Sequence, residues 1–587
     1  MLWFKKLKNF KWIFIAGFLL VTVFGIVHLY LVSDTFVVDN AGSIRTTFEG
    51  FGDIPLHLTQ ISKFAYAPNF NLNEPIFYGE KLHYPFLINL FSGLLLRITG
   101  WFTFSVMFPI YLLVIFNLIL LVAIYNKLFK NLLLTGIAIW IFMLGAGFGS
   151  FPYFSKALTE NYSIEQVKED ILNKKIITIL NWDAKYPSQN IDFSAPMPLV
   201  LVHQRTSLLG LFGFLLFLYL LIQLEFNLAP TWKNILGPSL VFGLLPMANT
   251  HSFVAVAMTV VSYGVFLIIK RNWSKLKNLF WLAFWASILA IPQLWYLVGS
   301  KSAFVNPDSF SKFRLGWMVS PTIGSVQFPA GVESSIFSLA YLHFLTVNFG
   351  VILLALVFCG VYFAFRYKKI KVDKTLPVIF LFSSLFLFLV VQVVRFQPWD
   401  FDNNKVLVYY QFFAVAFTLW LVQVVFVRYK KIMSTIIVIY FVATTLTGFI
   451  DIIPRMMVSK NNLPEIFNIS ASRLSFYIRY SVPKNQLILT SATHLNPVSS
   501  LAGREVLIGY PGWLWTRGLD YGEREQDLKD FYRDPKLFYG VLDKYKASYI
   551  LVELMAVNDY QAKREVFDQL FDKIFEDGQY SLYQVKK

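Results

Sequence analysis

Hydrophobic and polar positions divide the chain into two parts with different patterns. Up to residue 453, uncharged apolar runs of about twenty residues follow one another, separated by short polar segments. Such a run is typical of a helix that crosses a membrane, because about twenty helical residues span the hydrocarbon core. The runs that fit this length are 12–32, 104–125, 131–150, 206–224, 234–248, 252–269, 278–298, 344–365, 376–394, 406–427 and 432–452. They predict an α-helical polytopic membrane protein with about eleven transmembrane helices.

The pattern changes after Pro454, where the apolar patches shorten and charged residues return. The segments QLILT (486–490), EVLI (505–508) and SYILVE (548–553) predict buried strands. EREQDLKDFYR and AKREVFDQLFDKIF predict amphipathic helices. Alternating strands and helices indicate a small α/β domain. We therefore expect a transmembrane module over 1–453, with a large first outer loop over 33–103, and an extracytoplasmic α/β domain over 454–587.

Composition and charge support the membrane class. Of the 587 residues, 56% are hydrophobic and 15% are charged, whereas a soluble domain carries about a quarter charged residues. The net charge of +17 comes mostly from clusters between apolar runs, at 1–11, 126–130, 270–277, 366–374 and 428–431. Membrane orientation explains these clusters better than a nucleic-acid partner does. The single cysteine, Cys359, excludes an intramolecular disulfide.

The basic clusters also predict sidedness. Placing all of them in the cytoplasm follows the positive-inside rule and predicts a cytoplasmic N-terminus. The membrane that we expect to hold the protein is the plasma membrane. The first run is too long for the apolar core of a signal peptide, so we expect a retained anchor. The outer side then holds 33–103, 151–205, 299–343, 395–405 and everything after about 453.

The segment 84–100 is apolar but short for a crossing. If it crossed, every later basic cluster would face outward. The sequence therefore favours a re-entrant or surface-lying helix here, while a crossing stays open.

Ionisable residues gather at the outer ends of the predicted helices. None lies in the interior of the apolar runs, which argues against an ion-coupled transporter, because such transporters carry ionisable groups within their spans. The outer segments contain Asp53, His57, Glu74, Glu80, His83, Asp183, His203, Arg205, Asn249, His251, Arg395, Gln397, Asp400, Asp402 and Lys405. Acid, base and cation from separate stretches predict a reaction site at the outer membrane interface.

The first outer loop carries an ordered set of motifs. The anchor is followed by G-D-x-x-x-H, then by E-P, then by a Y-P that opens an apolar helix. The matching residues are Gly52, Asp53, His57, Glu74, Pro75, Tyr84 and Pro85. This order resembles the GT-C superfamily of integral-membrane glycosyltransferases, which use polyprenyl-phosphate-linked sugars, and within it bacterial members. The motifs cover about 1–150. One departure is Ile54, since many members carry a second acid beside the loop aspartate.

The resemblance implies an inverting transfer from a polyprenyl-phosphate sugar to an acceptor hydroxyl. A hydroxyl is a weak nucleophile, so a carboxylate must take its proton, and Asp53 is our candidate for this general base. The alternative is that Asp53 only caps the helix that starts near Ile54 and Pro55. Candidates for binding the departing phosphate are Arg395, Lys405 and Arg205, although each of these cations can equally snorkel to lipid headgroups.

The remaining polar residues leave alternatives open. PWDFDNNK (398–405) offers Asp400 and Asp402 as ligands for Mg²⁺ or Mn²⁺, but helix capping or acceptor binding is favoured, so we expect no cofactor. Candidates for binding acceptor or sugar are His57, Glu74, His83, His203, His251, Asp400 and Asp402. The aromatic segment GREVLIGYPGWLWTRGLDYGERE either stacks on carbohydrate or packs the domain onto the membrane, and packing is slightly favoured.

The expected partners are a lipid-linked sugar donor, the membrane, and an acceptor that is a glycan, a lipid or a protein. Competing functions are a lipid-linked glycan flippase or exporter, a glycan polymerase or ligase that uses a diphosphate-linked donor, and a catalytically inactive scaffold. A flippase needs a polar path through the spans, and the apolar runs do not provide one.

Overall fold

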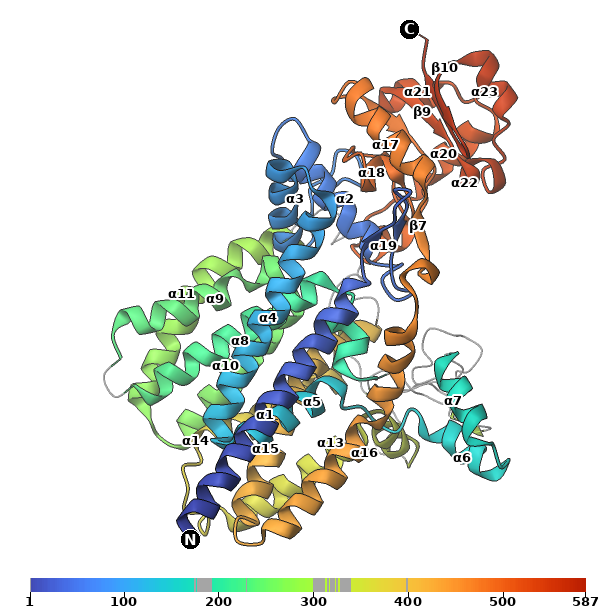
Figure 1. Ribbon diagram of the computed structural model, residues 1–587. Coiled ribbons are helices and arrows are strands. Elements are labelled where there is room, and N and C mark those ends of the chain that lie inside the picture. Colours follow the sequence, from blue (N-terminus) through green and yellow to red (C-terminus); the bar gives the residue numbers. More distant parts are fainter. Residues whose placement is uncertain are drawn as a thin grey trace. The chain divides into compact units, whose positions relative to one another are not determined.

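The computed structural model describes residues 2–173, 176, 193–227, 230–298, 312–313, 316, 322–323, 326–327, 339–396 and 400–586. The chain forms two compact units, and each is described by itself. Unit 1 contains Met1–Leu31, Leu113–Ile291 and Ser311–Val458, and unit 2 contains Val32–Leu112, Pro292–Phe310 and Ser459–Lys587. Most of the predicted first outer loop therefore folds together with the C-terminal region (Figure 1).

Long apolar helices make up most of the molecule. Within the described ranges, nine helices are long and apolar enough to cross a membrane. They are α1 (Leu2–Ser33), α4 (Phe102–Phe129), α8 (Arg205–Phe226), α10 (Thr250–Ile269), α11 (Trp273–Val298), α13 (Leu339–Arg366), α14 (Thr375–Val393), α15 (Asn404–Val425) and α16 (Lys430–Met457). The two other predicted crossings are shorter helices, α5 (Leu132–Leu144) and α9 (Trp232–Ala248).

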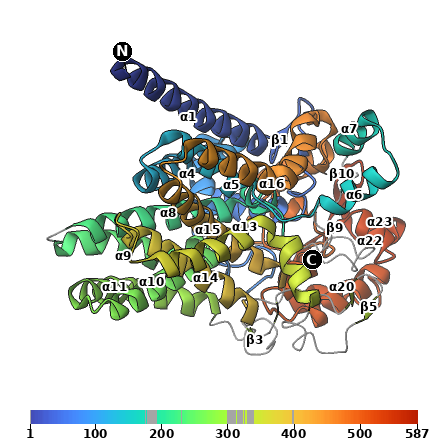
Figure 2. The same cartoon turned by 90° about the horizontal axis from the view of Figure 1, so that it is seen from below.

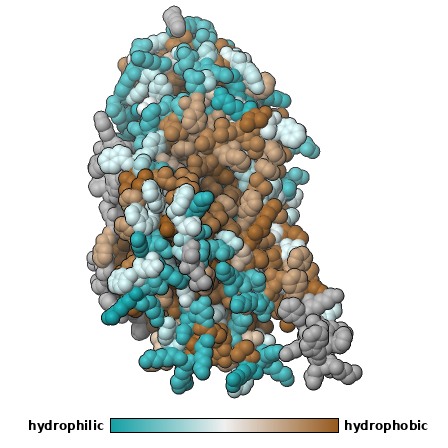
Figure 3. Space-filling model, turned by 90° about the vertical axis from the view of Figure 1, so that its left-hand side faces the viewer, coloured by the Kyte–Doolittle hydropathy of each residue, from teal (hydrophilic) through white to brown (hydrophobic). Residues whose placement is uncertain are grey.

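The outer surfaces of these helices are apolar. Phe358 and Phe365 of α13 are 73% and 85% exposed, and Figure 3 shows apolar side chains spread over a broad area of one face. Large apolar side chains are stable in this position only when lipid surrounds them. The predicted class, a multi-pass α-helical membrane protein, is confirmed.

Helices α8, α10, α14 and α15 pack side by side in unit 1 (Figures 1 and 2). Small residues permit the close approach: a Cβ on Gly210 of α8 would collide with Ser252 and Asn249 of α10. Asn249 caps α10 by accepting a hydrogen bond from the Ser252 N–H at 2.9 Å. This arrangement fixes the start of α10, where His251 lies.

Helix α5 ends earlier than the apolar run 131–150 predicts, and polar side chains from neighbouring helices explain why. Gln411 of α15 donates its Nε2–H groups to the carbonyls of Phe142 at 2.9 Å and Gly145 at 2.7 Å. Backbone groups inside a membrane need such partners when a helix stops. Two contacts from α16 hold the next residues: the Thr444 carbonyl accepts from the Ala146 N–H at 2.8 Å, and Thr447 Oγ1 donates to the Gly147 carbonyl at 2.9 Å.

The C-terminal part of unit 2 contains a four-stranded mixed sheet. Its strands, in spatial order, are β10 (Asp572–Asp577), β11 (Tyr580–Gln584), β9 (Ala547–Val552) and β8 (Leu487–Leu489). The β8–β9 pair is parallel and the others are antiparallel. The strands predicted at 486–490 and 548–553 are confirmed, and α20 (Gly522–Arg533) is the first predicted amphipathic helix.

Two C-terminal predictions differ from the structure. The segment 505–508 forms only single bridges, from Ile508 to Phe77 and from Val506 to Ile488. The helix predicted over 562–575 is wrong in its second half, because α23 (Arg564–Leu570) is followed by strand β10. Gly578, at φ +58°, makes the tight turn that lets β10 pair with β11.

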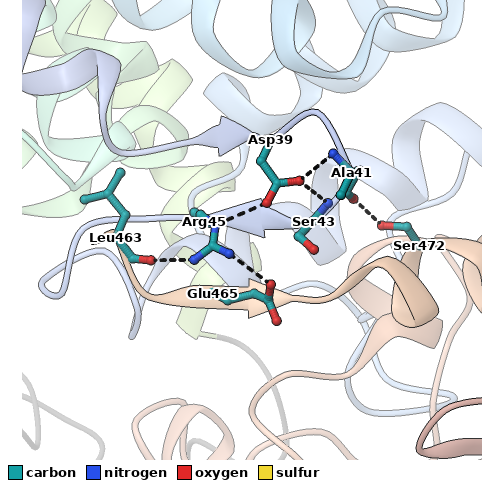
Figure 4. Close-up of polar contacts among 8 residues, drawn as sticks. Asp39, Ala41, Ser43, Arg45, Leu463, Glu465 and Ser472 are labelled. Atoms are coloured by element: carbon teal, nitrogen blue, oxygen red, sulfur yellow. Dashed lines mark hydrogen bonds and ion pairs between the residues drawn. The ribbon is translucent and has the colours of Figure 1, made fainter. Parts of the chain in front are cut away.

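The first loop and the C-terminal region of unit 2 share a small antiparallel sheet of β1 (Val37–Val38), β2 (Ile44–Arg45) and β7 (Glu465–Phe467). Figure 4 shows Arg45 at its centre. Arg45 donates to Asp39 at 3.2 Å, to the Leu463 carbonyl at 3.1 Å and to Glu465 at 3.3 Å. One side chain thus ties together strands that are more than 400 residues apart in sequence.

Two helices follow strand β2 in the chain, α2 (Ile54–Tyr66) and α3 (Leu87–Thr99). They approach closely at Gly93, where a Cβ would lie 2.5 Å from the Phe64 Cβ. On its other face, α3 exposes Phe91 (48%), Leu94 (42%) and Ile98 (82%). A helix of 13 residues is about 20 Å long, less than the membrane core of about 30 Å. Its length and its apolar stripe support the surface-lying or re-entrant reading of 84–100.

Candidate functional site

Asp53 lies at the N-cap position of α2 and is half-exposed. Its side chain makes no capping hydrogen bond, and its backbone is already in the helical region at φ −104° and ψ −36°. Capping is therefore not the role of this carboxylate in the structure. The positive end of the helix dipole favours an ionised group here, and ionisation is the state that a general base requires.

The turn before Asp53 is held by its own backbone and by threonines. The Gly50 N–H donates to the Thr47 carbonyl at 3.0 Å, and the Asp53 N–H donates to the Gly50 carbonyl at 3.2 Å. Thr46 Oγ1 donates to the Thr35 carbonyl at 2.6 Å. A Cβ on Gly50 would collide with this hydroxyl, so only glycine fits. The carboxylate of Asp53 thus extends from a well-defined turn.

His494, which the sequence analysis did not single out, contacts the two residues directly before Asp53. Its Nε2–H donates to the Gly52 carbonyl at 3.2 Å, and its ring stacks on Phe51 at 5.2 Å with 15° between the planes. Burial lowers the pKa of His494, more than the bond to Gly52 raises it, so the ring is neutral at neutral pH. No sequence signal identifies it, because 442 residues separate it from Gly52.

His57 lies one turn after Asp53 and is buried. Its Nδ1 accepts a hydrogen bond from Asn89 Nδ2 at 2.9 Å, and the same amide donates to Gln60 Oε1 at 2.8 Å. Asn89 of α3, another residue that the sequence analysis missed, therefore ties His57 and Gln60 of α2 to α3.

Glu74 is buried in an ion pair with Arg517 of the C-terminal region, with 2.5 Å between Oε2 and Nη1. The guanidinium group also lies 4.8 Å above the Tyr84 ring. This geometry makes Glu74 a structural anchor between the loop and the C-terminal region. Lys63 makes a second such pair with Glu505 at 2.6 Å.

His83 is also engaged in local structure. Its Nδ1–H donates to the Tyr296 carbonyl at 2.5 Å, and its Nε2 lies 3.6 Å from Glu80. Both contacts lie within unit 2 and hold the loop segment that precedes α3. His57, Glu74 and His83 thus all support the loop that carries Asp53.

The other predicted site residues belong to unit 1. Arg205 is the first residue of α8 and is buried, as is the nearby His203. His251, near the start of α10, lies within electrostatic reach of Asp402 and Lys405. Asp402 and Lys405 form an ion pair at 3.0 Å. The structure therefore brings these last three residues together.

The segment around Arg395 is organised by Asn403. Strand β6 (Val394–Arg395) pairs with β3 (Lys312–Phe313). Asn403 Nδ2 donates to the Val394 carbonyl at 2.8 Å, and Asn403 Oδ1 accepts from the Phe396 N–H at 3.1 Å. Asn403 therefore fastens β6 and makes no capping bond to α15.

Three predicted residues have little or no structural description. Asp400 opens the 3₁₀ helix η5 (Asp400–Asn403), but its side chain lies outside the described part. Asp183 and Gln397 lie outside the described residues altogether. Over the residues that are described, no group of three or more His, Cys, Asp or Glu could hold a metal ion.

Asp451 of α16 makes a polar contact that the sequence analysis did not predict. Ser194 Oγ donates to Asp451 Oδ2 at 2.5 Å. The apolar run 432–452 placed Asp451 at the outer edge of a crossing, but α16 continues to Met457. Four residues further on, Arg455 donates to the Pro198 carbonyl at 3.0 Å. The segment before α8 is therefore bound by polar groups of α16.

These features define a multi-pass membrane protein whose first loop, with one acidic residue at a helix start, is built into a C-terminal α/β region. No protein-family model matches the sequence, and no curated protein matches it. Among solved structures, several are similar to this chain over most of its length.

Two of these structures cover nearly the whole chain. The oligosaccharyltransferase of Archaeoglobus fulgidus, tethered with an acceptor peptide containing the NVT sequon, matches with a TM-score of 0.49 and 10% identity, over 97% of this chain and 74% of that one. ArnT from Cupriavidus metallidurans, bound to undecaprenyl phosphate, matches with a TM-score of 0.46 and 7% identity. The match covers 96% of this chain and 97% of that one.

Proposed function

We propose that the protein is an integral-membrane glycosyltransferase that moves a sugar from a polyprenyl-phosphate donor to an acceptor hydroxyl, with inversion. The observation that carries this proposal is the placement of Asp53: a half-exposed carboxylate at the start of a buried helix, with no capping bond, in a turn fastened by His494. The proposed location is the outer membrane interface, with the N-terminus in the cytoplasm.

In the proposed reaction, Asp53 takes the proton from the acceptor hydroxyl while that oxygen attacks the anomeric carbon. The bond from the anomeric carbon to the phosphate oxygen breaks, and polyprenyl phosphate leaves with the electron pair. The N-terminus of α2 favours the ionised carboxylate before the reaction. His494 positions the turn through the Gly52 carbonyl. General-base catalysis of this kind contributes about 10²- to 10⁴-fold to the rate.

Within unit 1, Arg205 is the first candidate for binding a lipid phosphate. A guanidinium group at a helix N-terminus combines two features that bind phosphate, because the helix end and the cation both attract negative charge. Arg395 is the second candidate. Lys405 is less suited, since Asp402 already neutralises it. A monophosphate leaving group can be stabilised by such a cation, and the proposal includes no divalent metal ion.

The test is turnover of polyprenyl-phosphate sugars by the purified protein and by Asp53→Asn. This substitution keeps the size of the side chain and removes the base, so we expect at least about a 10²-fold loss of rate. Asp559→Asn, at an exposed position of the C-terminal region, is the matched control and should keep the wild-type rate. Equal turnover by wild type and Asp53→Asn would refute the catalytic role of Asp53. Absence of turnover by the wild type would leave the flippase as the better candidate.

A further inference from the structure

Four aromatic rings form a cluster at the segment that immediately precedes Asp53 in the chain, and all of them belong to unit 2. The His494 ring stacks on Phe51 at 5.2 Å, lies 4.8 Å from Trp513 and meets Tyr510 edge-on at 5.2 Å. Tyr510 and Trp513 are themselves in edge-to-face contact at 5.5 Å. We name these residues, Phe51, His494, Tyr510 and Trp513, the aromatic cluster.

The cluster lies at the edge of the domain core, against which Trp513 packs. Helix α19 (Pro511–Trp515) buries Leu514 completely but leaves Trp513 half-buried. Tyr510 and Phe51 are 40% and 37% exposed. Burying these rings would be favourable, so core packing does not account for their position at the surface.

The backbone is shaped to place Tyr510 in this position. A Cβ on Gly512 would lie 2.5 Å from the Tyr510 ring, so a larger residue would displace the ring from the start of α19. The Trp513 N–H donates to the Tyr510 carbonyl at 3.1 Å, which fixes the spacing of the two aromatic residues.

His494 adds a polar group to the cluster. Its Nε2–H is used by the Gly52 carbonyl, while its Nδ1 is buried and has no hydrogen-bond partner within the described residues. In the neutral ring this nitrogen is an acceptor. Aromatic faces beside a few polar groups are typical of small-molecule sites, and a pyranose ring offers apolar C–H faces and donating hydroxyls that match them.

We propose that the aromatic cluster is a binding subsite for a pyranose ring of a carbohydrate acceptor. This inference rests on the proposed function, because it places the acceptor next to the base: Phe51 and Gly52, both contacted by His494, immediately precede Asp53 in the chain. The acceptor class is thereby narrowed to glycans and glycosylated molecules.

The first experiment measures binding without turnover. Maltotriose, chitotriose and mannotriose are titrated onto the full-length protein in lipid nanodiscs and followed by saturation-transfer difference NMR. We expect at least one of them to bind, and Trp513→Ala and Tyr510→Ala each to weaken its affinity by at least about fivefold. Trp515→Ala is the matched control, since Trp515 is 39% exposed on the same helix but lies outside the cluster.

Two binding results would overturn the inference: no trisaccharide binds the wild type at millimolar concentration, or both cluster variants bind as tightly as the wild type. Because the Tyr510 ring is exposed, Tyr510→Ala remains informative if Trp513→Ala fails to fold.

The second experiment separates the inference from the proposed function. In a transfer assay with the trisaccharide that binds, the cluster variants should raise the KM for this acceptor and leave the KM for the polyprenyl-phosphate sugar unchanged. A rise in the donor KM alone would assign the cluster to the donor sugar and overturn the acceptor assignment. Trisaccharide binding without any transfer by the wild type would instead refute the proposed function and leave the binding subsite standing.

Discussion

Asp53 and Glu74 show how surroundings decide what a carboxylate can do. Both lie in the first loop, and both are acidic residues in a chain that has few of them. Glu74 is fully buried against Arg517, so its charge is used for structure. Asp53 is half-exposed at a helix N-terminus, an end of the helix that attracts negative charge. This contrast, which the sequence could not provide, selects Asp53 as the proposed base.

Glu553 gives a pH-dependent prediction at a single residue. It follows strand β9, is buried, and accepts a hydrogen bond from the Ser491 hydroxyl. Burial raises its pKa to about 7. The folded protein therefore keeps this proton up to about pH 7, whereas the unfolded chain loses it near pH 4.5. The contribution of Glu553 to stability is full below pH 4.5 and falls as the pH rises to 7, by up to about 3 kcal/mol.

Glu553→Gln should remove this dependence. We expect the variant to gain stability relative to the wild type between pH 5 and pH 8, measured as the difference in melting temperature in detergent micelles. Glu565→Gln, an exposed position on α23, should show no such trend. A difference between wild type and Glu553→Gln that stays constant over this range would contradict the assignment.

Among the helices, α5 depends on a contact that no local pattern encodes. Its last carbonyls are bound by Gln411, so Gln411→Leu would leave buried backbone groups without partners. Since each such group costs about 1–3 kcal/mol, we expect a loss of about 2 kcal/mol or more, measured as a lower melting temperature in micelles.

The same helix α15 provides the control for this prediction. Gln423 donates to a single carbonyl, that of Phe129, at 3.0 Å, and its bond is only partly buried. Gln423→Leu should therefore destabilise the protein less than Gln411→Leu. If both variants melted at the same temperature, the explanation for the early end of α5 would be wrong.

For the chain as a whole, sidedness is the prediction with the widest consequences. The basic clusters predict that Arg97 and Lys484 face outward and that Lys127 faces the cytoplasm. Single cysteines at these positions, in a Cys359→Ala background, can be probed with a membrane-impermeant maleimide on spheroplasts of the expression host. We expect Arg97→Cys and Lys484→Cys to react in intact spheroplasts, and Lys127→Cys to react only after permeabilisation. Labelling of Lys127→Cys in intact spheroplasts would reverse the orientation and exclude an outer site.

Hydrophobic periodicity alone determined the membrane class, the positions of the long helices and the strands at 486–490 and 548–553. This was possible because run length and alternation record burial directly in local sequence. The same pattern misplaced the ends of α5 and α23. Gln411 of α15 binds the last carbonyls of α5, and pairing with β11 makes the segment after α23 a strand. Both ends therefore depend on contacts with other elements that hydrophobic periodicity does not record.

The candidate site was only partly predictable for the same reason. Asp53 stands out locally, as an acid in an ordered set of motifs, and its role remains a prediction. His494, Asn89 and Arg517 carry no local signal, because their partners lie up to 443 residues away. The sequence by itself determined a membrane chain with a charged first loop. Only the tertiary structure decided which C-terminal residues contact that loop, because such contacts depend on how distant segments pack and not on the order of neighbouring residues.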